Sequence, residues 1–149
     1  MVRPKAQTAA LMASPEDIEA QFYEALQQGD LDKLMSVWSD EDDVVCVHPG
    51  GPRVIGHRAI RAAFESIFAN GPIPVQPEKV RRVVGSTSAV HNLLERVDIA
   101  TSEGVQTAWV IATNVYQKTS QGWRLVAHHA SPGTAIELPE VGDAPSTLH

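Results

Sequence analysis

The chain has 149 residues, of which 43% are hydrophobic and 20% charged, so it fits one ordinary globular domain with a single core. Its formal net charge of −6 makes nucleic acid and anionic membrane surfaces poor partners, and we expect neither. No apolar run approaches the roughly 20 residues of a membrane span, so we expect a cytoplasmic protein.

Two helices are predicted near the N-terminus, after a leader over residues 1–13 that we expect to be flexible. Ser14 is a typical N-cap, and the proline and two acids that follow it favour a first helical turn. Apolar residues then recur at helical spacing as far as Gly29, a typical helix stop. Asp30 caps a second, shorter helix that reaches Trp38. The two helices would pack together on one face of a sheet.

Residues 44–47 predict a short buried strand, which the segment 48–52 ends abruptly because it holds two Pro and two Gly. His48 therefore stands at the exit of this strand, on a rigid turn that could mount a functional group. Cys46 cannot form an intrachain disulfide, because it is the only cysteine, and its apolar neighbours favour a buried, inert thiol. A third helix is predicted over residues 57–68.

Four longer strands follow, over residues 78–84, 90–100, 105–119 and 122–131, with short polar turns between the last three. The remaining residues, 133–149, are rich in Pro and without periodicity, so we expect a tail. Helices before strands predict an α+β domain. We expect a strongly curved antiparallel sheet wrapped around three N-terminal helices, forming a cone-shaped barrel with a ligand cavity inside.

The turn over residues 101–104 sets the pairing of the two predicted strands that it joins, residues 90–100 and 105–119. Counting back from it, Glu95 lies opposite Val110 and His91 opposite Asn114. Because side chains alternate between the faces of a sheet, these polar groups share one face with small and apolar neighbours. That combination marks the candidate pocket.

The turn over residues 119–122 sets the pairing of the last strand. Regular pairing places Asn114 opposite Ala127 and brings His129 onto the polar face, whereas a slip of one residue would exchange it for His128. The opposite face is apolar enough to need a cover, which a second subunit would supply. Its residues are Leu94, Trp109, Ile111, Val115 and Val126.

The order of elements and four motifs resemble the nuclear transport factor 2-like superfamily, and within it the SnoaL-like and ketosteroid-isomerase-like proteins. The motifs occupy residues 29–31, 47–51, 56–60 and 122–131, and the resemblance covers residues 14–132. It implies an α+β cone, an internal pocket and a homodimer. Tyr23 has the position of the tyrosine that ketosteroid isomerases use, but the rest of their catalytic set is not matched, so steroid isomerisation does not follow.

Within the cone we expect acid–base chemistry on a small apolar organic molecule. Glu95 would have a raised pKa in an apolar pocket and serve as acid or base, with His129 or His48 relaying the proton. Asn114 could hydrogen-bond a carbonyl that gains charge. The predicted substrate-binding residues are Phe22, Tyr23, Trp38, His91 and Trp109.

These residues predict a protein that binds a small molecule. We expect it to act on that molecule as an isomerase, cyclase or hydrolase that needs no cofactor. A non-catalytic dimerisation or ligand-binding module is the alternative, in which the polar groups only satisfy one another. A metal site from His48, His91, His129 and Glu95 is a third reading. Because those four residues come from separate elements without a short-spaced motif, we expect no metal.

Overall fold

The computed structural model describes residues 14–133 and 142, so the predicted leader and nearly all of the predicted tail lie outside the described residues. The described helices are α2 (Pro15–Gln28), α3 (Leu31–Val37) and α4 (His57–Phe68). The strands are β1 (Val45–Val47), β2 (Arg53–Ile55), β3 (Val75–Val84), β4 (Ser88–Thr101), β5 (Gly104–Thr119) and β6 (Gly122–Pro132).

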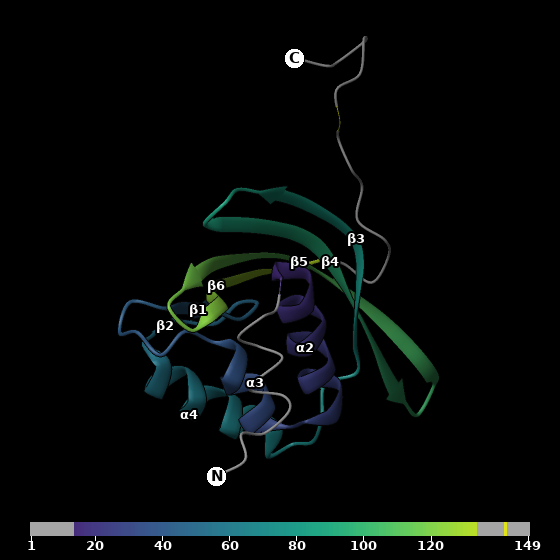
Figure 1. Cartoon of the computed structure of the whole chain (residues 1–149). Helices are drawn as coiled ribbons and strands as arrows, with labels where there is room; N and C mark the ends of the chain where they lie inside the picture. The colour runs from purple at the N-terminus through teal and green to yellow at the C-terminus, as the bar shows by residue number, and fades with distance from the viewer. Residues whose placement is uncertain (1–13, 134–141, 143–149) are drawn as a thin grey trace.

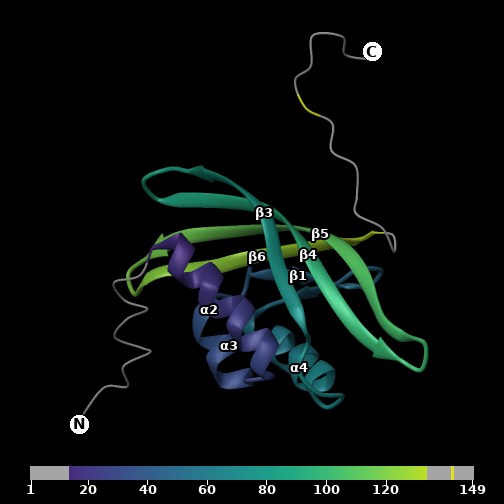
Figure 2. The same cartoon turned by 90° about the vertical axis from the view of Figure 1, so that its right-hand side faces the viewer.

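The six strands form one curved, open sheet in the order β2-β1-β6-β5-β4-β3, and all three helices lie on the same side of it (Figures 1 and 2). This confirms the predicted α+β cone. Two details differ: β1 runs parallel to β6, which makes the sheet mixed, and β2 was not predicted. The parallel pairing cannot be predicted from local turns, because about half of the chain separates β1 from β6. The second is a strand of three residues, too short for a detectable alternation.

The ends of α2 follow from local chemistry. The Ser14 side chain accepts a hydrogen bond from the backbone N–H of Asp17, whose carboxylate accepts one from the Ser14 N–H, a complete capping box. At the other end Gly29 has a φ of 65°, and a Cβ there would lie 3.3 Å from Pro72. These two ends fix the length of the helix that supplies one wall of the cone.

Among the described residues, no helix is both long and apolar enough to cross a membrane.

The core fills the space between the helices and the concave face of the sheet. The largest fully buried aliphatic and phenylalanine side chains come from the helices and the sheet alike: Ile18, Phe22, Leu34, Ile60, Phe64, Leu93 and Leu125.

The pairing of β4 with β5 is as predicted. Glu95 lies opposite Val110 and His91 lies opposite Asn114, without interruption along the two strands. The four-residue turn between them therefore carries its register unchanged to the middle of the sheet, where the polar side chains lie.

The predicted pairing of β5 with β6 is wrong by one residue beyond a β-bulge. Near the turn Tyr116 pairs with Leu125, but the next pair joins Val115 to Ala127, which leaves Val126 as an extra residue. Such an extra residue reverses the alternation of every side chain that follows it.

The bulge exchanges the two neighbouring histidines. Asn114 lies opposite His128, where regular pairing predicts Ala127, so His128 joins the inner face. His129 lies opposite Thr113, and its side chain is exposed on the outer face.

Candidate functional site

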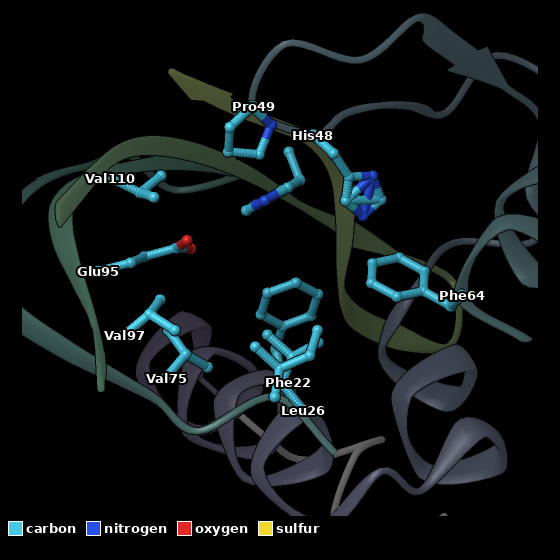
Figure 3. A pocket seen from close by; sticks show the side chains of 11 residues that line it. Phe22, Leu26, His48, Pro49, Phe64, Val75, Glu95, Val97 and Val110 are labelled. Atoms are coloured by element: carbon cyan, nitrogen blue, oxygen red, sulfur yellow. The ribbon is translucent and has the colours of Figure 1, made fainter. Parts of the chain in front are cut away.

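A pocket of about 180 Å³ lies between the helices and the concave face of the sheet (Figure 3). Most of its lining is apolar and comes from α2, α4 and strands β3 to β6, with polar groups only from Glu95, His48 and His128. The lining residues are Phe22, Leu26, His48, Pro49, Phe64, Ile73, Val75, Glu95, Val97, Val110 and His128.

Glu95 is the acidic residue of this pocket. Its side chain is only 8% exposed, and Figure 3 shows its carboxyl group pointing from β4 into the space between the apolar side chains. The Tyr23 hydroxyl donates a hydrogen bond to Oε2 over 2.7 Å. Burial raises the pKa of Glu95 to about 7, although this hydrogen bond works in the opposite direction. The carboxyl group can therefore both lose and regain a proton near neutral pH.

Asn114 links Glu95 to His128 through Tyr23. Its Nδ2 donates to the Tyr23 hydroxyl oxygen over 3.0 Å, and its Oδ1 lies 2.5 Å from Nδ1 of His128. Both ends of the amide are engaged, and Asn114 is not among the residues that line the pocket, so it orients its neighbours and does not meet the carbonyl that we expected it to bind. Burial and the Glu95 charge raise the pKa of Tyr23 well above its ordinary value, so the phenol stays protonated.

Two imidazoles face the same pocket. Burial lowers the pKa of His128 to about 3, and the charges of the neighbouring His48 and His129 act in the same direction with smaller effect. Burial also lowers the pKa of the half-buried His48. The centres of the His48 and His128 rings lie 6.3 Å apart. Both rings are therefore neutral near pH 7, and among the described residues of the pocket lining only Glu95 can carry a charge there.

The structure separates the predicted substrate-binding residues. Phe22 lines the pocket, and Tyr23 lies directly behind Glu95. Trp38 is 2% exposed and belongs to the core at the end of α3, outside the pocket lining. Trp109 lies opposite Arg96 on the outer face of the sheet.

His91 belongs to a second buried polar cluster. Its Nδ1 lies 2.8 Å from Oε2 of Glu19, whose Oε1 lies 3.3 Å from Nη2 of Arg82. The His91 ring packs 4.8 Å from the ring of Tyr116. Sequence reasoning missed Glu19, although an acid one helical turn before Tyr23, on the apolar side of α2, was an available signal.

The four residues weighed as metal ligands do not gather. His48 and Glu95 line the pocket, whereas His91 is paired with Glu19 and His129 is on the outer face. Within residues 14–133 and 142, no group of three or more His, Cys, Asp or Glu side chains is arranged to hold a metal ion.

A curved sheet over three helices, with a carboxyl group inside an otherwise apolar pocket, defines a cone-shaped α+β protein of the nuclear transport factor 2-like class. The model of the SnoaL-like domain matches residues 16–135, so the chain belongs to the SnoaL-like family. No curated protein matches the chain.

Solved structures agree with this assignment. A candidate calcium/calmodulin-dependent protein kinase type II association domain from Thiobacillus denitrificans is 34% identical, with a TM-score of 0.73, over 81% of this chain and 96% of that one. A candidate dehydratase of the same superfamily from Streptomyces avermitilis is 31% identical, with a TM-score of 0.70, over 79% and 92%. A Pseudomonas putida member of unknown function is 17% identical, with a TM-score of 0.69, over 78% and 82%, and shares the fold.

A pH titration of Glu95 tests its environment. We expect its carboxyl carbon, followed by ¹³C NMR in the full chain, to titrate with a midpoint near 7, well above the ordinary 4.5. Tyr23→Phe removes a hydrogen bond that favours the carboxylate, so the midpoint should rise further. His129→Ala is the control, because His129 lies on the outer face of the sheet, away from the pocket. A wild-type midpoint near 4.5 would contradict the assignment.

Proposed function

We propose that this chain is an enzyme that moves protons on a small organic molecule, with Glu95 as its acid–base residue and no cofactor. The observation that carries the proposal is the Glu95 carboxyl group, which is buried, held by Tyr23 and in contact with an apolar pocket. A general acid or base works best when its pKa lies near the working pH, and the pKa of Glu95 is about 7.

The hydrogen bond from Tyr23 leaves one oxygen of Glu95 for the reaction. Oε2 is occupied, and Oε1 makes no hydrogen bond with any described residue while the side chain lines the pocket. A proton on this carboxyl group is therefore best placed on Oε1, where a bound molecule can give or take it. Figure 3 shows His48 on the opposite side of the pocket from Glu95, beside Phe64, where its neutral ring can hydrogen-bond the oxygen of that molecule.

Dehydration and isomerisation are the reactions that one such carboxyl group performs without help. In dehydration the Glu95 carboxylate removes a proton from the carbon beside a carbonyl group. The C–O bond to the β-hydroxyl breaks as the C=C bond forms, and Glu95 returns its proton so that the hydroxyl leaves as water. In isomerisation the proton returns to another carbon. The 31% identical relative that is named a candidate dehydratase supports this choice.

A one-ring β-hydroxyketone, 3-hydroxycyclohexanone, tests the reaction through the ultraviolet absorbance of its product, 2-cyclohexenone. We expect turnover that rises with pH through a midpoint near 7, as Glu95 ionises. Glu95→Gln should lower the rate by about 100-fold or more, the usual contribution of a general acid–base group. His129→Ala, on the outer face, is the control and should keep the wild-type rate. Full activity in Glu95→Gln would overturn the proposal.

The outer face of the sheet favours self-association as a second function. Val90 and Ile111 are each 38% exposed there, next to half-buried Val115 and Trp109. Four apolar side chains on one exposed face are typical of a subunit interface. The 34% identical relative from Thiobacillus denitrificans, named as an association domain, supports self-association. We propose a homodimer formed through this apolar face.

A charge placed on this face tests the homodimer. Ile111→Lys should convert a dimer into a monomer in analytical ultracentrifugation, because an ammonium group would be buried in the apolar interface. The matched control is Ile55→Lys, which changes an isoleucine that is 51% exposed on the edge strand β2. A wild-type monomer at micromolar concentration, or a dimer that survives Ile111→Lys, would count against the interface.

A further inference from the structure

The hydrogen bonds of the pocket fix the tautomer of His128. Because the Tyr23 hydroxyl gives its proton to Oε2 of Glu95, its oxygen must accept from Nδ2 of Asn114. That orientation turns Oδ1 of Asn114, which can only accept, toward Nδ1 of His128. Nδ1 therefore carries the hydrogen of this neutral ring, and Nε2 is left with a lone pair.

This lone pair is the acceptor that the pocket offers when Glu95 is protonated, because a proton on Oε1 makes that oxygen a donor. His128 lines the pocket and is 5% exposed. The centres of the His128 and Phe22 rings lie 5.3 Å apart. Nε2 makes no hydrogen bond within the part of the chain that the structure describes. Because His128 lines the pocket, a molecule that enters it with an O–H or N–H group can donate to this nitrogen.

The charge of the pocket restricts its ligand in a second way. Among the described residues that line it there is no Lys or Arg, and the imidazoles of His48 and His128 stay neutral near pH 7. The pocket is therefore neutral or singly negative, according to the state of Glu95. A carboxylate or phosphate would lose its water shell there and gain no cation in return.

We infer that the pocket selects an uncharged molecule of about one ring that donates a hydrogen bond to Nε2 of His128, and that it rejects anions of the same size. The volume of about 180 Å³ supports this size, since a cavity of about 150 Å³ holds benzene. The inference rests on the proposed function for the choice of this pocket as the site. It makes His128 a specificity residue, and it predicts a substrate with a hydroxyl or N–H group.

Three compounds with the same ring test the inference by binding alone. Cyclohexanol is neutral and donates, methoxycyclohexane is neutral and does not donate, and cyclohexanecarboxylate is an anion. Their affinities for the full chain would be measured by NMR titration near pH 6, where Glu95 is protonated and does not compete with Nε2 as an acceptor, while the carboxylate ligand is still an anion. We expect cyclohexanol to bind about tenfold more tightly than the ether, the effect of one hydrogen bond, and the carboxylate not to bind. The ¹⁵N signal of Nε2 in His128 should shift with cyclohexanol only.

Variants of His128 and Glu95 test which residue causes the preference for cyclohexanol. His128→Phe should reduce the affinity for cyclohexanol to that for the ether, whereas His129→Phe, on the outer face, should leave both unchanged. Glu95→Gln should still exclude the carboxylate, because the described lining then still offers no cation. If His128→Phe does not fold, the wild-type comparison and the Nε2 signal still decide.

Equal binding of ether and alcohol, tight binding of the carboxylate, or no binding of any compound at millimolar concentration would overturn the inference. Selective binding without turnover of 3-hydroxycyclohexanone would leave the inference standing while removing support for the proposed enzyme.

Discussion

The hydrogen bond from the Tyr23 hydroxyl to Glu95 is the contact on which the site depends. It joins α2 to the middle of β4 and holds an acid in a space that is otherwise apolar. A buried carboxyl group without a partner would be strongly destabilising. Here each polar group satisfies the next, through Asn114 to His128, and the two ends of this chain of hydrogen bonds face the pocket. A structural requirement, the pairing of buried polar groups, thus leaves one acid and one acceptor for a ligand.

Much of the fold could be predicted from the sequence because its signals are local. Ser14 and Gly29 mark the two ends of α2, and α4 has the predicted bounds of residues 57–68. The turn over residues 101–104 is short enough to fix the pairing of Glu95 across β4 and β5. The carboxyl group in an apolar setting, which is the central feature of the site, followed from that pairing.

The rest could not be predicted because it depends on contacts between distant segments. The extra residue Val126 looks like any other strand residue, yet it exchanges His129 for His128 at the pocket. The pairing of His91 with Glu19 depends on how α2 lies across the sheet, which no local pattern records. Trp109 is a different case: it was expected in the pocket on account of its residue type, although the predicted alternation already placed it on the outer face, where the structure has it.

The central claim is that burial favours the protonated form of Glu95 and so raises its pKa. The pH dependence of the unfolding free energy tests this claim most directly. The pKa of Glu95 in the folded chain, about 7, exceeds the ordinary 4.5, so its stabilising effect is complete below 4.5 and is lost as the pH rises through 7. Urea unfolding of the wild type and Glu95→Gln should show it, because glutamine does not titrate. We predict that the unfolding free energy of the wild type falls by about 3 kcal/mol relative to the variant across this range. A difference that stays constant with pH would contradict the account.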